Sequence, residues 1–276
     1  MATDYSRLKA VPKREEPYHI VVSMAHHDDI EFGVSGSVAR WIKEEGATVT
    51  YIIITDGGAG SNEPGVKRAD LVARRKEEQI AAARAVGVTD VRFLNYPDGN
   101  LEATMDVRRD ITRIIRETKP YRVIIQDPTT VFMRSFYINH PDHRAAGEAS
   151  LYAVFPSAET RPIFPELLDE GYEPHTVKEL YINLTENPTH YVDISDYIDI
   201  KLDSLRAHVS QIGEGEAAEN GALKWVKNMD SNVGKYLGAQ YVEFYRVMKF
   251  DEEREDWFDE DMQAQDNTAT AEVPGN

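Results

Sequence analysis

The chain has 276 residues, an apolar fraction of 41%, a formal net charge of −17 and no cysteine. This length and composition are typical of one large globular domain, and the missing cysteine excludes disulfides, thiolate catalysis and cysteine-ligated metal sites. The acidic balance argues against binding to a nucleic-acid backbone, and no apolar run approaches the roughly 18 residues that cross a bilayer.

Strand and helix patterns alternate through the first half of the chain. Apolar, β-branched runs predict buried strands at residues 20–24, 49–54, 91–95 and 123–126. A helix is predicted after each strand: the first with apolar positions 34, 38, 41 and 42 on one face, the second over 70–86 with a stop at Gly87, the third with apolar positions 107, 111, 114 and 115, and the fourth beginning near 141. This alternation predicts a Rossmann-like α/β fold, with a mostly parallel sheet and helices on both faces.

The pattern changes after residue 155. Residues 156–176 are rich in proline, glutamate and glycine and predict a long loop or lid, followed by strands at 180–184 and 191–194 and a helix with apolar positions from 198 to 209. We divide the chain into an N-terminal extension (1–17), a single α/β domain (18–250) whose C-terminal strands and helices form part of the pocket, and an acidic, flexible tail (251–276). The extension lacks the apolar core of a signal peptide, so we expect a cytoplasmic protein with neither nucleic-acid nor membrane partners.

Polar side chains follow each of the four strands of the first half. The first strand leads directly into Ala25-His26-His27-Asp28-Asp29-Ile30-Glu31. The other three lead to Asp56, to Asp98 and to a segment that ends in His140-Pro141-Asp142-His143. Ligands bind beyond the carboxyl ends of the strands in open parallel sheets, so the sequence predicts a single site at that edge.

The two histidine-bearing segments favour a metal site. An Asp-Asp pair by itself is more often a helix cap or a solvated turn, but here His26 precedes the pair and a second histidine pair follows a matching strand. A catalytic site of this kind takes three protein ligands and keeps one open position. Imidazole and carboxylate ligands without thiolate suit Zn²⁺, with Fe²⁺, Co²⁺ or Mn²⁺ as alternatives.

These motifs resemble the LmbE / PIG-L family of zinc-dependent N-deacetylases. The resemblance extends over about residues 19–212 and includes four further stretches: Arg75-Lys76-Glu77-Glu78, Tyr96-Pro97-Asp98-Gly99, Val192-Asp193-Ile194 and His208-x-Ser210-Gln211. It implies a metal-dependent hydrolase that removes an acetyl group from the amide nitrogen of a small N-acetylated amino sugar or its conjugate. Relatives often form trimers or hexamers, which leaves a homo-oligomer open.

The resemblance also implies roles for individual residues. It makes His26, Asp29 and His143 the metal ligands and Asp28 the general base. His140 would stabilise the oxyanion or protonate the leaving amine, with Asp142 as its partner. Arg75 and Asp98 occupy positions that contact sugar hydroxyls in relatives; the alternatives are an ion pair for Arg75 and an ordinary turn for Asp98.

The sequence departs from the family where His27 replaces the usual proline, which frees a backbone N–H. We expect His27 to point outward or to support the site from behind. His208 is expected either in the pocket wall or as a satisfied buried histidine, and Tyr137, close to the second histidine pair, is given no role.

Three rival functions remain open at this stage. The first is an amidase with the same chemistry that acts on a thiol-sugar conjugate. The second is a non-catalytic carbohydrate-binding protein whose metal is structural, in which case a fourth protein ligand should close the site. The third is a metal-dependent phosphoesterase, which would usually need two metals and more carboxylates than the motifs contain.

Overall fold

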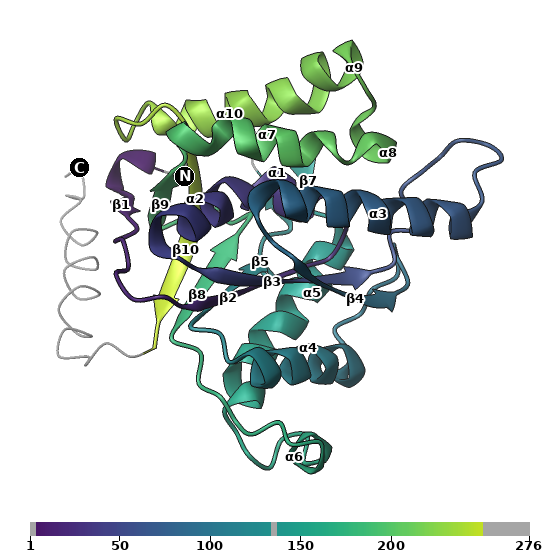
Figure 1. Ribbon diagram of the computed structural model, residues 1–276, viewed down its shortest axis with the longest axis vertical. Coiled ribbons are helices and arrows are strands. Elements are labelled where there is room, and N and C mark those ends of the chain that lie inside the picture. The colour runs from purple at the N-terminus through teal and green to yellow at the C-terminus, as the bar shows by residue number, and fades with distance from the viewer. Residues whose placement is uncertain (1–3, 134–136, 251–276) are drawn as a thin grey trace, which may run out of the picture.

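The computed structural model describes residues 4–133 and 137–250, and its centre is an eight-stranded sheet (Figure 1). In spatial order the strands are β1 (Lys9–Ala10), β9 (His190–Asp193), β10 (Val242–Lys249), β8 (Glu179–Asn183), β5 (Arg122–Gln126), β2 (His19–Met24), β3 (Thr48–Thr55) and β4 (Asp90–Tyr96). All pairs are parallel except those of β10, which runs antiparallel to β8 and β9. The mostly parallel sheet predicted from the sequence is confirmed.

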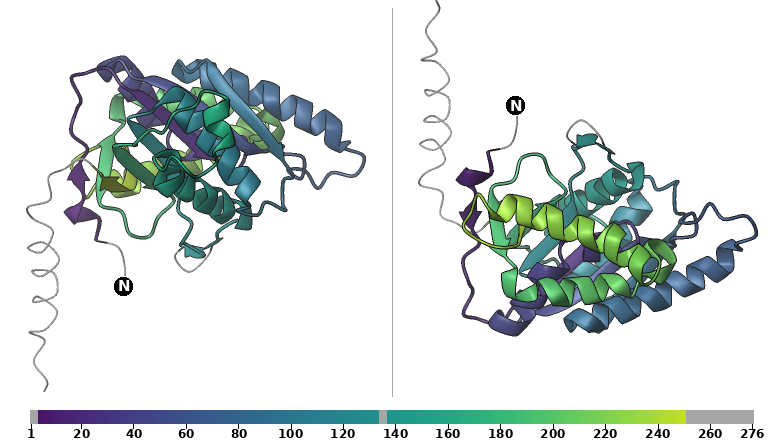
Figure 2. Two further views of the ribbon diagram at one scale, coloured as in Figure 1. Left: turned by 90° about the horizontal axis from the view of Figure 1, so that it is seen from below. Right: turned by 90° about the horizontal axis from the view of Figure 1, so that it is seen from above.

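Helices cover both faces of the sheet (Figures 1 and 2). One face carries α1 (Asp29–Gly33), α2 (Ser35–Glu45), α3 (Arg68–Val86), α7 (Ile198–Arg206), α8 (Val209–Ile212), α9 (Glu216–Ala218) and α10 (Lys224–Gly234). The other carries α4 (Met105–Thr118), α5 (Pro141–Tyr152) and the short α6 (Glu166–Asp169). The remaining short elements are η1 (Tyr5–Arg7), η2 (Ala153–Ala158), η3 (Ser195–Tyr197), η4 (Glu219–Leu223) and a hairpin of β6 (Phe132–Met133) and β7 (Tyr137–Ile138).

Strand β3 contributes side chains to two separate cores. Successive side chains of a strand point to opposite faces of the sheet. Tyr51 and Ile53 therefore pack with α2 and α3 in one core, while Ile52 and Ile54 pack with α4 and α5 in the other. This two-sided burial is the reason why the strand reads as a continuous apolar run rather than an alternating one.

The chain enters helix immediately after the first histidine motif. The sequence predicted a helix whose apolar face begins at Val34, but α1 already begins at Asp29, and Val34 (φ −141°) separates it from α2. The Val34 amide donates to the Ile30 carbonyl oxygen at 2.8 Å, which ends the first turn. Asp28 and Asp29 are therefore the cap and the first residue of a helix, which holds the two carboxylates in different positions.

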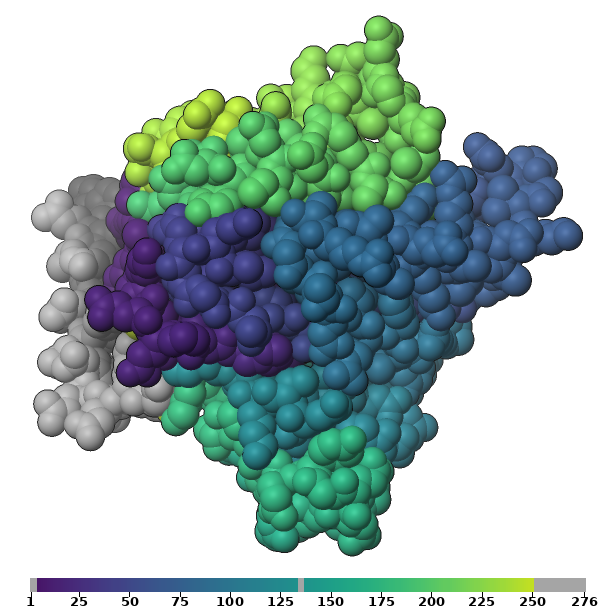
Figure 3. All heavy atoms as spheres, in the orientation of Figure 1, coloured from purple at the N-terminus to yellow at the C-terminus, as the bar shows by residue number. Residues whose placement is uncertain are grey.

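Residues 156–176 lie over α4 and project from the lower edge of the molecule (Figure 3). The buried guanidinium of Arg116 on α4 donates to four backbone carbonyl oxygens of this segment: those of Ser157, Ala158, Thr160 and Ile163. A cavity opens at the carboxyl ends of the central strands, and none of its described lining residues comes from this segment. Of the two alternatives, a long loop or a lid, the lid is therefore wrong, because this segment is bound to α4 and does not line the cavity.

Strand β10 was not predicted from the sequence; it inserts between β8 and β9. Its buried Glu243 accepts hydrogen bonds from the amides of Gly36 (3.1 Å) and Ser37 (2.7 Å) at the start of α2. Lys201 of α7 lies between Glu243 (2.7 Å) and Asp230 of α10 (3.0 Å) and is fully buried. One buried cation therefore joins α7, α10 and β10.

Replacing Lys201 with methionine should lower the free energy of unfolding by about 3–5 kcal/mol, because two buried carboxylates lose their counter-ion. Arg206→Met is the matched control: its side chain is 41% exposed and pairs with Asp203 and Glu219, so about 0–1 kcal/mol is expected. Equilibrium unfolding in urea measures both variants. Equal losses would mean that the buried lysine contributes no more than a surface ion pair.

The structure near the N-terminus differs from the predicted domain limits. Lys9 and Ala10 add an edge strand beside β9, so part of the predicted extension belongs to the sheet. The predicted acidic tail at 251–276 lies outside the described residues. Among the residues that are described, no helix is both long and apolar enough for a bilayer crossing. The cytoplasmic location and the oligomeric state stay predictions.

Candidate metal centre and active-site cavity

A cavity of about 690 Å³ lies at the carboxyl ends of the central strands. Its lining includes all the predicted site residues but one: His26, Asp28, Asp29, Arg75, Asp98, His140 and His143. Asp142 is buried and stands outside the lining. The two histidine-bearing segments, more than a hundred residues apart, meet here because β5 pairs directly with β2.

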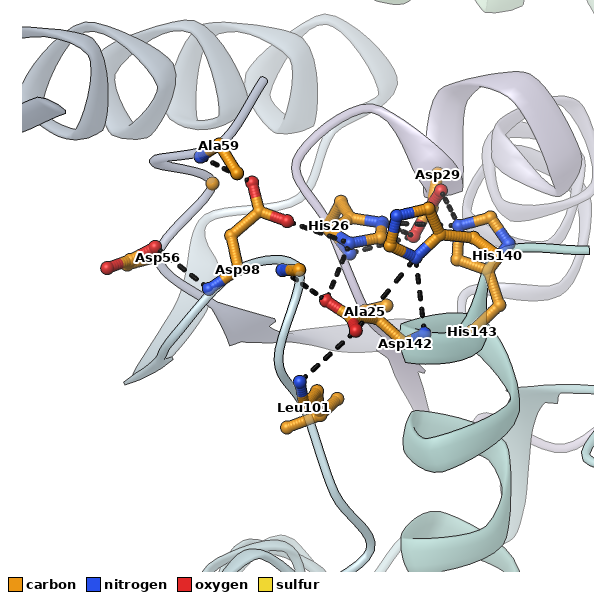
Figure 4. A network of polar contacts seen from close by, with 12 residues as sticks. Ala25, His26, Asp29, Asp56, Ala59, Asp98, Leu101, His140, Asp142 and His143 are labelled. Carbon is orange, nitrogen blue, oxygen red and sulfur yellow. Dashed lines mark hydrogen bonds and ion pairs between the residues drawn. The ribbon is translucent and has the colours of Figure 1, made fainter. Parts of the chain in front are cut away.

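Three side chains form a compact set of potential metal ligands (Figure 4). His26 Nδ1 lies 3.2 Å from His143 Nε2 and 3.4 Å from Asp29 Oδ2, and His143 Nε2 lies 3.1 Å from Asp29 Oδ1. A four-coordinate ion with ligand bonds of about 2.0–2.1 Å holds its ligand atoms about 3.3 Å apart. The spacings of His143 Nε2 to His26 Nδ1 and to Asp29 Oδ1 are close to this value, and one ligand atom from each of the three side chains lies within 4.8 Å of the others, so the set can hold such an ion.

The second nitrogen of each imidazole has its own acceptor. His26 Nε2 faces Asp98 Oδ1 at 3.2 Å and Asp142 Oδ2 at 3.3 Å, while His143 Nδ1 lies 3.0 Å from Asn139 Oδ1. A proton on each of these nitrogens leaves the lone pairs of His26 Nδ1 and His143 Nε2 directed at the ligand set. Metal-binding histidines are held in this way.

Asp29 is oriented by two donors, one of which, Gln126, was not predicted from the sequence to belong to the site. Its Oδ2 accepts from the His26 amide at 2.7 Å and from Gln126 Nε2 at 3.0 Å. Gln126, the last residue of β5, also accepts from the Ala25 amide at 3.0 Å, so it connects the ends of β5 and β2. The one signal for Gln126 in the sequence was a polar residue at the end of an apolar strand.

Asn139 is the other supporting residue that was missed. Its Nδ2 donates to the Thr130 carbonyl oxygen at 2.9 Å, which leaves Oδ1 free to accept from His143. Asn139→Ala should weaken metal affinity by about 10–100-fold, as loss of such a partner typically does. Competition with a chromophoric chelator measures the affinity, and Asn187→Ala, at an exposed position, is the control. Unchanged affinity in Asn139→Ala would show that His143 needs no such support.

Asp28 lies beside the ligand set and takes no part in it. It adopts a left-handed conformation (φ 93°) at the start of α1, and its amide donates to Gln79 Oε1 at 3.2 Å. Its carboxylate oxygen lies 3.5 Å from Arg75 Nη2. Burial raises the pKa of Asp28 to about 6, although the Arg75 guanidinium opposes the rise. A carboxylate with a pKa in this range can accept a proton at neutral pH and release it again.

A buried network behind Asp28 explains the position of His208. Gln79 Nε2 donates to Glu31 Oε1 at 3.1 Å, and His208 Nε2 lies 3.0 Å from Glu31 Oε2. Both Glu31 and His208 are fully buried. Of the two expectations for His208, the structure therefore shows the buried residue with a partner, outside the cavity lining.

His140 and Asp142 are arranged differently from the expectation. His140 caps α5, its Nδ1 accepts from the Asp142 amide at 3.2 Å, and its side chain is 40% exposed at the cavity. The Asp142 carboxylate lies 4.0 Å from His140 Nδ1. It faces His26 and accepts from the amides of Gly99 (2.7 Å) and Leu101 (3.1 Å). Asp142 thus supports a potential ligand, His26, rather than His140. The two amides of the turn after β4 hold its carboxylate in this orientation.

The pKa values of His140 and Asp142 follow from these contacts. Burial lowers the pKa of His140, and the neighbouring His26 imidazole lowers it further. Burial raises the pKa of Asp142, but the hydrogen bond with His26 and those from Gly99 and Leu101 lower it below its ordinary value. His140 therefore favours its neutral form, while Asp142 favours its ionised form.

Arg75 and Asp98 form one wall of the cavity. Arg75 is almost fully buried, and it donates to the carbonyl oxygens of Gly57 (3.0 Å) and His27 (2.7 Å). Asp98 accepts from the Ala59 amide at 2.9 Å. Burial would raise the pKa of Asp98, but hydrogen bonds from His26 and Ala59 hold it at about 2. A cation and an anion thus stand side by side at the cavity surface.

His27 does not point outward. Its ring is fully buried, stacks on Phe93 with centroids 5.4 Å apart, and has no hydrogen-bond partner on either nitrogen. Burial lowers the pKa of His27 to about 3, and the Arg75 guanidinium adds to this effect. His27 is therefore a neutral packing residue behind the cavity wall.

Comparisons with known proteins connect this geometry to a family. Residues 21–154 match the family model PIG-L, described as GlcNAc-PI de-N-acetylase. A diacetylchitobiose deacetylase from Thermococcus kodakarensis is 32% identical over 243 residues, which cover 86% of each of the two chains. This chain belongs to the PIG-L family.

Two further deacetylases that are similar to this chain agree with this membership. The crystal structure of N,N'-diacetylchitobiose deacetylase from Pyrococcus horikoshii, in complex with an inhibitor, has a TM-score of 0.76 to this chain at 28% identity and covers 84% of both chains. A probable N-acetyl-alpha-D-glucosaminyl L-malate deacetylase 2 from Bacillus anthracis is 30% identical over 202 residues, or 70% of this chain and 81% of that one. The family and the fold expected from the sequence are confirmed.

Proposed function

We propose that this chain is a zinc-dependent hydrolase that removes an acetyl group from the amide nitrogen of a small N-acetylated amino sugar or its conjugate. The observation that carries the proposal is the compact set of His26, Asp29 and His143 with the Asp28 carboxylate beside it in one cavity. Membership of the PIG-L family and the deacetylase names of its relatives support the choice of reaction.

His26, Asp29 and His143 would hold the ion. Two imidazoles and a carboxylate suit Zn²⁺, and Fe²⁺ suits the same set. When bound, the ion polarises the amide carbonyl group and acidifies a water molecule. Among the described residues this ligand group contains three side chains, which favours a catalytic site with an open position over a structural site closed by a fourth ligand.

The side chains of the protein supply the proton transfers. Asp28 takes a proton from the attacking water while the water oxygen bonds to the carbonyl carbon. His140, exposed at the cavity, stabilises the oxyanion by donating from its Nε2–H, because its Nδ1 accepts from the Asp142 amide. Asp28 passes the proton that it took from the water to the leaving nitrogen. The carbon–nitrogen bond then breaks, and the products are a carboxylate and a free amine. Arg75 and Asp98 offer a donor and an acceptor to the hydroxyl groups of the sugar.

Release of acetate and primary amine from a panel of N-acetylated substrates tests the proposal. We expect zinc-loaded enzyme to hydrolyse N-acetylglucosamine or N,N'-diacetylchitobiose, a chelator to abolish the reaction, and added zinc to restore it. Turnover confined to an N-acylated thiol-sugar conjugate would favour the amidase alternative. Saturable sugar binding without amine release from any substrate would overturn the enzymatic proposal.

A further inference from the structure

The two sides of the cavity differ in chemical character, and the strand order explains why. The potential metal ligands His26 and Asp29 follow β2, which lies between β3 and β5. On the β3 and β4 side, the wall consists of charged side chains and backbone polar groups, contributed by Arg75, Asp98 and the loop at Ala59. A polyhydroxylated sugar ring finds hydrogen-bond partners on this side.

The opposite side is mainly apolar, although Asn183 at the end of β8 also lines it. Its apolar side chains are those of Phe32 from α1, Leu184 just after β8, Trp225 and Met229 from α10, and Phe244 from β10. We call these five residues the apolar lobe. The rings of Phe32 and Trp225 meet edge to face with centroids 6.1 Å apart. Because β10 runs antiparallel to β8 with Arg246 opposite Ile182, Phe244 lies level with Leu184, just past the end of β8.

The acidic groups near this lobe are already paired. Asp230 and Glu243 also line the cavity, but both carboxylates accept from Lys201. Trp225, in contrast, is 50% exposed although it faces a cavity. An apolar ligand that covers the Trp225 ring would remove its surface from water, which is favourable.

The geometry of the amide group determines which part of a bound N-acyl sugar lies near the apolar lobe. The carbonyl carbon is trigonal, so its nitrogen and its acyl carbon point away from each other. With the carbonyl group at the ligand set and the sugar at Arg75 and Asp98, the acyl carbon points to the side of β8 and β10. We propose that the apolar lobe binds the hydrocarbon chain of an N-acyl group longer than acetyl, so that the substrates include N-acylated amino sugars with chains of about four to six carbons. This inference rests on the proposed function.

A chain-length series on the zinc-loaded, full-length enzyme tests the inference. We would measure kcat/KM for N-acetyl-, N-butanoyl- and N-hexanoylglucosamine. Each buried methylene can contribute up to about fourfold, so the hexanoyl substrate should exceed the acetyl substrate by about tenfold or more. Trp225→Ala should flatten this dependence. Tyr236→Ala is the matched control, since Tyr236 is also an exposed aromatic residue near α10 but lies outside the cavity lining, and it should leave the dependence intact.

Direct binding gives a readout that does not depend on turnover. Hexanoate should bind the wild-type enzyme about tenfold more tightly than acetate by calorimetry, and Trp225→Ala should remove the difference. A steady fall of kcat/KM with chain length would overturn the inference and leave the deacetylase intact. If Trp225→Ala lowered kcat/KM for the disaccharide N,N'-diacetylchitobiose but for none of the N-acylglucosamines, the inference would also be overturned, because the lobe would then bind a second sugar. Failure of every substrate, acetyl included, would instead count against the proposed function.

Discussion

Replacing Asp28 with asparagine should lower kcat by about 10²–10⁴-fold while the fold and the metal content stay unchanged. General bases typically contribute rate factors of this size, and asparagine cannot accept the proton of the attacking water. Asparagine is also the replacement that best tolerates the left-handed backbone at this position, where φ is 93°. Asp28→Ala would combine the loss of the base with backbone strain. Steady-state kinetics with elemental analysis of the same sample measures the effect.

Asp203→Asn is the control for this substitution, because Asp203 lies on the surface of α7 and pairs with the exposed Arg206. It should leave kcat unchanged. Near-normal turnover in Asp28→Asn would remove Asp28 from the mechanism. Loss of metal in the same variant would mean that Asp28 belongs to the ligand set.

Replacing His143 with alanine should remove the metal and, with it, the activity. His143 lies inside α5, where alanine is a good helix former, so the helix should persist. The loss of one of three ligands should weaken zinc binding more than the loss of a supporting residue does, by well over about 100-fold. Elemental analysis after dialysis against a chelator should find wild-type protein loaded and the variant empty.

His175→Ala serves as the control for metal content, because His175 Nε2 is bound to the Pro120 carbonyl oxygen, remote from the ligand set. Full zinc occupancy in His143→Ala would show that the ligands are misassigned. The group His26, His140 and Asp142, whose potential ligand atoms also lie near one another, would then be the alternative site.

The parts of this protein that the sequence predicted correctly are those that local patterns encode. The apolar runs at 20–24 and 49–54 predicted β2 and β3 because burial on both faces requires consecutive apolar residues. The end of α3 at Val86 was predicted from the glycine that follows it, Gly87 (φ 95°). The polar residues after each strand predicted a site at one edge, because all parallel strands end on the same side.

The partners of those polar residues depended on tertiary structure. Asp142 was expected to support His140, two residues away, yet it contacts His26 and the turn after β4. His27 was expected outside or behind the site, and its burial against Phe93 depends on β4. The spacing of two residues in the sequence gives only their distance along the chain. The contacts of Asp142 with His26 and of His27 with Phe93 depend instead on which strands are neighbours in the sheet.

By itself, the amino-acid sequence determined the family, the mostly parallel sheet and the residue types gathered at its edge, because each of these rests on short motifs and on local burial patterns. Only the tertiary structure decided that an antiparallel strand inserts beside β8, that Lys201 joins three elements, and that the cavity has one polar and one apolar side. These features arise where side chains far apart in the chain must share one buried volume, and no local pattern records which of them will meet.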